Sequence, residues 1–286
     1  MTVPAPLLEP QVRAADGHRW TLLTRLPQAP RSAVLWLPAL GVAARHYLTF
    51  ADALARRGVA VFLHEWRGHG SSSLRAGGGR DWGYRELLVQ DIPASQAEMD
   101  RLLPPGTPCV LGGHSLGGQL ACCRLALAPG TAGGLWLVAS GAPYWRAFPM
   151  PQRAWLPYAY RFLPWLARVR GYLPGRRIGF GGNEAAGLVA DWGRSAISGR
   201  YAAAGLDRDL DAAMAQLAQP VRALVLARDW MAPRGSLDFL LGKLSSARVE
   251  ATCFDDQALG ARADHFTWMK VPDAVVDWLL AQPAPA

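Results

Sequence analysis

The sequence has few charged residues and almost no lysine. Charged residues make up 18% of the 286 positions, and Lys243 and Lys270 are the only lysines among 30 basic residues. The remaining 28 are arginines, scattered without a basic run of five or more, so the net charge of +8 does not indicate a surface that binds nucleic acid. We therefore expect no nucleic acid among its partners.

Long hydrophobic runs are also missing. A membrane-spanning helix needs about 20 consecutive apolar residues, whereas the uncharged stretches 102–123 and 125–145 are interrupted by glycine and proline. No basic segment followed by an apolar run begins the chain, which predicts no secretory signal. We expect a cytoplasmic protein without a transmembrane segment; peripheral membrane contact stays open, as does the choice between monomer and homodimer.

Cysteine is scarce and unpatterned. The four cysteines are Cys109, Cys122, Cys123 and Cys253, and none falls in a Cys-x-x-Cys pair or a Cys/His spacing typical of zinc. We expect buried free thiols. No metal site follows from this pattern.

What the chain does have is apolar residues, at 51%, arranged in short runs that alternate with helix-length segments. Continuous apolar runs of this length indicate strands buried on both faces, and the alternation predicts a parallel sheet. The expected strands are 32–37, 58–63, 109–112, 134–139, 221–227 and 248–254; the expected helices are 43–57, 84–103, 116–127, 236–244 and 273–281. Residues 9–14 and 19–26 are interpreted as an antiparallel hairpin at the sheet edge. The predicted fold class is α/β, with a mostly parallel central sheet flanked by helices.

Residues 144–215 interrupt this alternation, because they contain no clear strand pattern. They hold 12 of the 27 aromatic residues and ten arginines against five acidic residues. We interpret them as a helical cap inserted into a core domain formed by residues 1–143 and 216–286.

The most specific motif is Gly113-His114-Ser115-Leu116-Gly117. It follows an expected strand and opens an expected helix, the context of a nucleophile elbow. A serine at such a turn occupies strained backbone, and its hydroxyl stands at a helix N-terminus that favours a developing anion. The alternative is an ordinary glycine-rich turn between a strand and a helix.

With this motif, the sequence resembles the α/β-hydrolase superfamily, and within it the serine aminopeptidase-like and monoacylglycerol lipase-like branch. The resemblance runs from about Arg19 to Leu280. It rests on four segments: Gly113-His-Ser-Leu-Gly-Gly118, Glu65-Trp-Arg-Gly-His-Gly-Ser71, Arg228-Asp-Trp-Met-Ala-Pro233 and Asp264-His-Phe266.

A nucleophilic serine needs a base, and histidine suits neutral pH. Of the six histidines, His265 lies just before the final helix, where the resemblance places the catalytic histidine. Asp229 follows the 221–227 strand and precedes Pro233 by four residues, as the orienting acid of the family does. Its competitors are Asp255, Asp256 and Asp264. The order Ser115, Asp229, His265 matches the α/β-hydrolase order.

Acyl transfer also needs two donors for the oxyanion. The Leu116 amide comes with the elbow. The second donor follows the 32–37 strand, where the family commonly has His-Gly and this chain has Pro38-Ala39-Leu40-Gly41. Pro38 has no N–H, so the aligned donor is the Leu40 amide, with Ala39 as a weaker alternative.

The Glu65–Ser71 segment resembles a structural turn of the family. Two glycines would take positive φ and a charged pair would fix the loop. A metal site built from His64 and His69 is the less favoured reading, because no third ligand is suitably spaced.

Most aromatic residues of the cap are expected to form its own small core. Trp145, with Trp230 beside Asp229 and Phe266 beside His265, is predicted to line an apolar acyl pocket. Arg176 and Arg177 are interpreted as a solvated basic face, with attraction of an anionic head group as the alternative.

These observations predict a serine hydrolase that needs no cofactor. It would cleave small-molecule carboxylic esters with an apolar or medium-chain acyl group through an acyl-enzyme on Ser115. An aminopeptidase or amidase and an acyltransferase would use the same residues. From a different class, a non-catalytic binding module on this fold is the remaining alternative.

Overall fold

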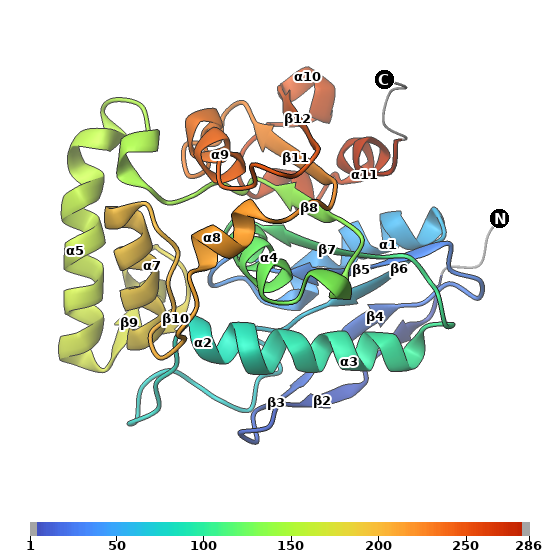
Figure 1. The fold of residues 1–286 in the computed structure, drawn as a ribbon, viewed down its shortest axis with the longest axis horizontal. Helices are drawn as coiled ribbons and strands as arrows, with labels where there is room; N and C mark the ends of the chain where they lie inside the picture. Colours follow the sequence, from blue (N-terminus) through green and yellow to red (C-terminus); the bar gives the residue numbers. More distant parts are fainter. Residues whose placement is uncertain (1–4, 282–286) are drawn as a thin grey trace.

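The computed structural model describes residues 5–281, and its centre is an eight-stranded sheet (Figure 1). Its strands lie side by side in the order β1 (Leu7–Leu8), β4 (Leu23–Arg25), β6 (Val59–Leu63), β5 (Ser32–Leu37), β7 (Cys109–His114), β8 (Leu135–Val138), β11 (Val221–Leu226) and β12 (Val249–Phe254). All neighbours from β6 to β12 are parallel, whereas β1 and β4 are antiparallel additions. The predicted mostly parallel sheet is confirmed.

Helices cover both faces of this sheet. One face carries α1 (Leu48–Arg56) and α11 (Asp273–Leu280); the other carries α3 (Ile92–Leu102), α4 (Leu116–Leu127), α8 (Leu210–Ala215) and α9 (Arg234–Leu241). Shorter elements are 3-10 helices η1 (Ala44–Tyr47), η3 (Pro129–Thr131), η4 (Trp145–Ala147) and η5 (Thr267–Met269), α2 (Tyr84–Glu86), the π-helical η2 (Leu87–Asp91) and α10 (Asp256–Leu259). The flanked sheet is the α/β-hydrolase fold.

Strand β5 shows why the short apolar runs became central strands. Its side chains alternate between the two cores, with Val34 and Trp36 on the α1 side and Leu35 and Leu37 on the α4 side. Both faces are covered, so both sets must be apolar. The predicted bounds of this strand agree with the structure, as do those of α4.

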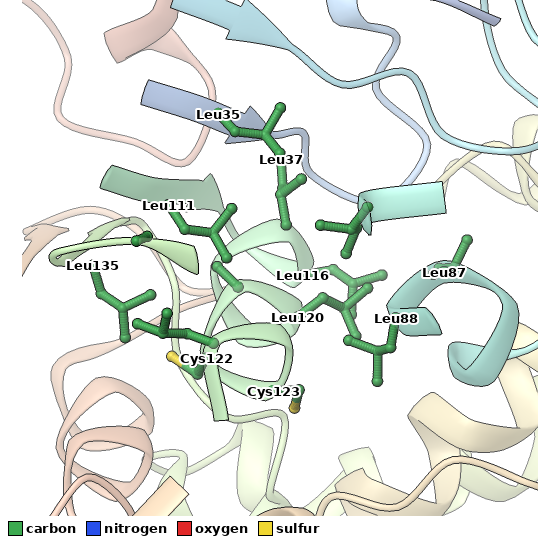
Figure 2. Close-up of a cluster of buried hydrophobic side chains, with 14 of the residues drawn as sticks. Leu35, Leu37, Leu87, Leu88, Leu111, Leu116, Leu120, Cys122, Cys123 and Leu135 are labelled. Carbon is green, nitrogen blue, oxygen red and sulfur yellow. The ribbon is translucent and has the colours of Figure 1, made fainter. Parts of the chain in front are cut away.

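Helix α4 fills the space between the sheet and the η2 segment (Figure 2). Leu116 and Leu120 belong to the same core as Leu87 and Leu88, and most of the helix is buried. A helix that is apolar on all sides is stable only when it is enclosed in this way. The nucleophile motif therefore stands on one of the most enclosed elements of the chain.

Two expectations about strands are wrong. The hairpin predicted at the sheet edge forms a separate two-stranded sheet, β2 (Gln11–Arg13) with β3 (Arg19–Thr21), and β1 is the edge strand of the main sheet. The 144–215 segment, expected to lack strands, contains the antiparallel pair β9 (Tyr172–Pro174) and β10 (Asn183–Ala185). Three-residue strands are too short to show a clear alternating pattern.

The expectation of buried thiols holds only in part. Cys122 and Cys123 are buried in α4, but Cys109 is half-buried and Cys253 is exposed. Cys253 lies on β12, the last strand of the sheet, where only one neighbouring strand is present and exposed positions recur. The prediction that every run was buried on both faces failed at this edge.

Between β8 and β11, the chain forms η4, α5 (Gln152–Arg170), β9, α6 (Gly175–Ile178), β10, α7 (Ala186–Ser198) and α8. Helices α5 and α7 pack against each other, and α5 is the outer of the two (Figure 1). Helix α8 packs on α4. In residues 5–281, no helix combines the length and apolarity needed to cross a membrane.

Candidate active site

Ser115 occupies the turn between β7 and α4, where its backbone is strained. Its φ of 55° and ψ of −120° lie outside the ordinary regions for a non-glycine residue. The turn requires glycine on both sides: a Cβ on Gly113 would clash with the backbone of Gly117 and Gly118, and one on Gly117 would clash with the Leu37 carbonyl. The strand–serine–helix geometry predicted from the motif is present, with Ser115 half-buried at the helix N-terminus.

Asp229 and His265 are in direct contact, although 36 positions separate them. The Oδ2 atom of Asp229 lies 2.6 Å from Nδ1 of His265, and both residues are buried. The other carboxylate oxygen accepts hydrogen bonds from the backbone N–H groups of Met231 and Ala232. These bonds fix the carboxylate, which in turn orients the imidazole.

The three competing carboxylates have other partners. Asp255 accepts a hydrogen bond from the Ala258 N–H at the start of α10. Asp256 pairs with Arg228, and Asp264 accepts the backbone N–H groups of the residues after His265. Among the candidates, Asp229 is the one that contacts the His265 ring.

The imidazole of His265 lies beside the elbow. Its ring centroid is 4.6 Å from that of His114, the residue before Ser115. Within residues 5–281, the Ser115 hydroxyl makes no hydrogen bond, so the serine-to-histidine bond is not formed here. Such bonds are often long without substrate and tighten in the Michaelis complex.

The loop after β5 separates the two oxyanion alternatives. The Ala39 N–H donates a 2.9 Å hydrogen bond to the Tyr47 hydroxyl, so it is already used. Leu40 and Leu116 line one small cavity together. Neither Ser115 nor His265 lines this cavity, so the choice between the Ala39 and Leu40 amides rests on the Tyr47 bond, which occupies the Ala39 N–H.

Tyr47 is a residue of this site that no sequence motif indicates. Its hydroxyl also lies 2.8 Å from Nδ1 of His114, joining the loop after β5 to the Ser115 turn. Burial raises the pKa of Tyr47 and lowers that of His114 well below its ordinary value, so both are neutral at pH 7. A tyrosine in an expected helix carries no signal of this role, because the contact spans 67 positions.

In the Glu65–Ser71 turn, Gly68 and Gly70 have the predicted positive φ, at 87° and 41°. The charged residues do not pair with each other. Glu65 accepts the backbone N–H groups of Ala44 and Ser71, and burial raises its pKa. Burial destabilises the Glu65 carboxylate anion. The two backbone hydrogen bonds that it accepts join this turn to Ala44 and so fix the loop.

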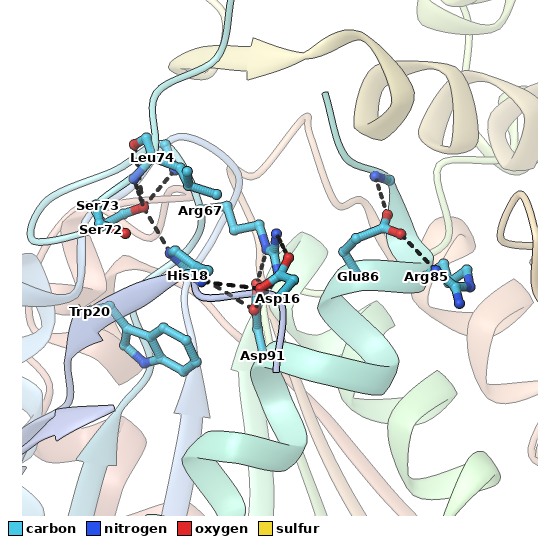
Figure 3. A network of polar contacts seen from close by, with 12 residues as sticks. Asp16, His18, Trp20, Arg67, Ser72, Ser73, Leu74, Arg85, Glu86 and Asp91 are labelled. Carbon is cyan, nitrogen blue, oxygen red and sulfur yellow. Dashed lines mark hydrogen bonds and ion pairs between the residues drawn. The ribbon is translucent and has the colours of Figure 1, made fainter. Parts of the chain in front are cut away.

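Arg67 belongs to a separate polar network, which is buried except at Asp16 (Figure 3). Its guanidinium bonds both oxygens of Asp91 and also Asp16, while His18 lies between Asp91 and Ser72. Burial lowers the Arg67 pKa, but the two carboxylates outweigh it and raise the pKa overall. This network ties the turn to η2 and the β2–β3 hairpin.

The same turn contacts the 144–215 segment through a second buried pair. Nε2 of His69 lies 3.1 Å from the Glu184 carboxylate on β10. Close by, Gly41 of the loop after β5 approaches Gly181 and Gly182 so tightly that a Cβ would clash with their backbone. The segment between β8 and β11 therefore supports the loop that carries Leu40.

No group of three metal-ligating side chains occurs within residues 5–281. His64 lies 2.9 Å from the Ser95 hydroxyl and His69 contacts Glu184, so the two histidines face different partners. Of the predicted pocket residues, Trp230 and Phe266 are exposed, at 51% and 41%, and Trp145 packs beside the small cluster around Phe148.

Comparison with known families agrees with this geometry. The profile described as serine aminopeptidase, S33, matches residues 28–195, which is more than half of the chain. The chain belongs to this family. The matched range of this S33 hydrolase contains Ser115 and the Pro38–Gly41 loop, but ends before Asp229 and His265, whose placement rests on the contacts described above.

Solved structures share the fold of this S33 hydrolase at low sequence identity. The α/β hydrolase GrgF from Penicillium sp. sh18 is 13% identical, with a TM-score of 0.63 and coverage of 96% of this chain and 98% of its own. A hydrolase from Pseudomonas aeruginosa PA01 is 19% identical, with a TM-score of 0.58 and coverage of 97% and 98%. An esterase from Exiguobacterium antarcticum is 14% identical, with a TM-score of 0.62 and coverage of 96% and 98%.

Proposed function

We propose that this S33 hydrolase is a serine esterase that acts on small carboxylic esters with an apolar or medium-chain acyl group. The observation that carries the proposal is the strained Ser115 turn at the N-terminus of α4 beside a buried Asp229–His265 pair at 2.6 Å. An activated serine, a base and an acid that orients the base are the requirements for nucleophilic acyl transfer.

In the proposed reaction, Ser115 Oγ attacks the ester carbonyl carbon while Nε2 of His265 takes the hydroxyl proton. The carbonyl oxygen becomes an anion, held by the Leu40 and Leu116 amides. Collapse breaks the bond to the alkoxy oxygen, which leaves as the alcohol with the proton from His265. Water then attacks the acyl-enzyme with the same base, releasing the acid and restoring Ser115. No step needs a cofactor.

Support for Leu40 as a donor comes from its surroundings. Tyr47 already occupies the Ala39 N–H, and the Gly41–Gly182 approach fixes the loop from the other side. We further propose that residues 144–215 act as a cap on a core of 1–143 and 216–286, with Trp145, Trp230 and Phe266 bordering the acyl pocket. The contact between His69 and Glu184 would fix the position of this cap on the core.

An aminopeptidase is the second candidate, because the matching family carries that description. Binding a free α-amine requires an available carboxylate near the nucleophile. The two buried acids of the 144–215 segment are occupied: Glu184 bonds the Gly182 N–H and His69, and Asp191 bonds the Tyr84 N–H and Arg194. Because neither carboxylate is available to bind an amine, a substrate with an uncharged acyl group is favoured. An acyltransferase and a non-catalytic module stay as the remaining alternatives.

The first experiment is covalent labelling. The protein and its Ser115→Ala variant are incubated with a fluorophosphonate and their intact masses recorded. One adduct on the parent and none on the variant is the expected result. A folded parent that takes no adduct would contradict the triad and favour the non-catalytic module.

The second experiment separates the reaction classes. Nitrophenyl esters of increasing acyl length are compared with aminoacyl nitroanilides, and free acid is measured as the product. We expect kcat/KM to be highest for medium-chain esters. Faster cleavage of the anilides would replace the esterase by an aminopeptidase, and product without free acid in the presence of an alcohol acceptor would indicate an acyltransferase.

A further inference from the structure

Helix α5 exposes a row of large apolar side chains to solvent. They recur at alternating spacings of three and four residues, which puts them within an arc of about 80° on one face of a helix. The residues are Trp155, Tyr158, Phe162, Trp165 and Val169, with exposed fractions of 44%, 75%, 54%, 58% and 65%. We call this face the α5 stripe.

The α5 stripe is not the face that holds the helix in place. Leu156, Tyr160 and Ala167 are buried on the opposite side, where α5 packs on α7 and β9. Helix α5 is the outermost element on its side of the molecule (Figure 1). The exposed side chains of the stripe lie on the helix face opposite the buried ones. Exposed aromatic residues lower the solubility of a protein, and they do not contribute to the packing of its fold. A regular row of them therefore marks an interaction surface.

The charge on this part of the chain has one sign. Helix α5 carries four arginines and no acidic residue, and Arg176 and Arg177 follow it in α6. Within residues 5–281 none of these six arginines forms a salt bridge, whereas Arg194 and Arg200 of the same segment pair with Asp191 and Asp209. The surface around the α5 stripe is therefore basic and uncompensated.

The α5 stripe continues into the exposed aromatics beside the candidate catalytic residues. The Trp155 ring centroid lies 6.2 Å from that of Trp230, which follows Asp229 in sequence. Phe266, the residue after His265, is also exposed. An apolar partner of α5 would thus lie close to the loops that carry the acid and the base.

We propose that the α5 stripe docks this protein on an anionic lipid bilayer. Tryptophan, tyrosine and phenylalanine on one face with arginines around them are the composition of a helix that lies in a membrane interface. A second copy of the chain is the other occupant of an apolar helix face, but joining two α5 helices would bring arginines against arginines. An anionic bilayer neutralises them.

The test is co-sedimentation with vesicles, using the Ser115→Ala protein so that no turnover contributes. Vesicles of phosphatidylcholine alone are compared with vesicles that also contain phosphatidylglycerol. We expect binding to the mixed vesicles, weaker binding to the neutral ones, and release from the mixed vesicles as salt is raised.

Two double variants examine the two components of the surface. Phe162→Ser with Trp165→Ser should weaken binding to mixed vesicles by at least about tenfold, since two exposed aromatic anchors are lost. Arg161→Gln with Arg168→Gln should weaken it by about tenfold and reduce its salt dependence. Matched controls elsewhere on the surface are Val89→Ser with Val271→Ser and Arg13→Gln with Arg19→Gln, which should bind as the parent does.

Circular dichroism and Tm verify that each variant is folded, which is expected because the altered side chains are exposed. Failure of the parent to bind mixed vesicles at low salt would overturn the proposal. So would equal binding by parent and stripe variant. Sedimentation equilibrium tests whether a second copy of the chain binds the α5 stripe instead. A dimeric parent together with a monomeric Phe162/Trp165 variant would assign the stripe to self-association. Because binding is the readout, the result stands whether or not the esterase proposal holds.

Discussion

Helices α4 and α5 are both rich in apolar residues, yet the structure treats them in opposite ways. Helix α4 lies between the sheet and η2, and Leu116, Leu120, Leu125 and both of its cysteines are buried (Figure 2). Helix α5 contacts its neighbours along one side and exposes Phe162 and Trp165 on the other. Composition alone does not decide burial; the elements packed around a helix do.

The difference also separates two kinds of function. Helix α4 holds Ser115 by close packing, in which glycine is required because backbone meets backbone. Helix α5 has no such constraint on its outer face, and its side chains are available to a partner. Substitutions on the two helices should therefore differ in their effects on stability and activity.

The largest effect is expected for Gly117→Ala on α4. The new Cβ would meet the Leu37 carbonyl, so strand β5 and helix α4 must separate. We expect a loss of more than about 4 kcal/mol in the free energy of unfolding, or no folded protein. Urea denaturation measures it. Gly171→Ala at the end of α5 is the matched control: its φ of 76° makes alanine strained, but a Cβ there has open space, so the loss should be about 1 kcal/mol. Equal losses of unfolding free energy in the two variants would contradict the proposed difference in packing between α4 and α5.

The next effect compares truncations on the two helices. Leu120→Ala leaves a cavity in the main core, because Leu120 is fully buried, and should cost about 2–5 kcal/mol. Phe162→Ala removes a larger side chain that is 54% exposed, and should change stability by less than about 0.5 kcal/mol. Urea denaturation of both variants gives the difference. A loss above that level for Phe162→Ala would mean that the α5 stripe is part of the packing.

Much of this contrast was visible in the sequence, but not all of it. The bounds of β5 and α4 follow from apolar runs and from the glycine-rich motif, and the order Ser115, Asp229, His265 led to the observed Asp229–His265 contact. Such signals are local, or they depend on a motif with fixed spacing.

Long-range contacts left no comparable signal. Tyr47 reaches His114 across 67 positions, and the exposure of Cys253 depends on β12 being the last strand. The small β9–β10 pair forms because the two segments meet in the fold. Three residues are too few to show the alternating pattern that predicts a strand. The exposed face of α5 could not be predicted for the same reason, because only the tertiary packing decides which of its aromatic side chains stay exposed.

Acid should weaken the core more than the surface, and His64 shows why. Burial lowers its pKa to about 3, against an ordinary value of 6.5. Between these values the unfolded chain binds a proton that the folded chain does not, so stability is fully present above pH 6.5 and decreases as the pH falls. The contribution is about 1.4 kcal/mol for each pH unit. Urea denaturation at pH 6.5 and 5 should therefore show a drop of about 2 kcal/mol from His64. The His64→Gln variant should lose that part of the slope, and an unchanged slope would show that other groups cause the acid sensitivity.

The smallest effect is expected for the Tyr47 hydroxyl, which joins the loop after β5 to the Ser115 turn. Tyr47→Phe removes the acceptor of the Ala39 N–H and the partner of His114, while the packed ring stays in place. We expect kcat for a nitrophenyl ester to fall about tenfold with little change in KM, because the loop would present Leu40 less precisely to the oxyanion of the transition state. Tyr84→Phe is the matched control. Tyr84 is equally buried and its hydroxyl has no hydrogen-bond partner within residues 5–281, so both parameters should stay close to those of the parent. If the two variants lost kcat equally, the loss would reflect general disturbance of the core, and the position of Leu40 would not depend on Tyr47.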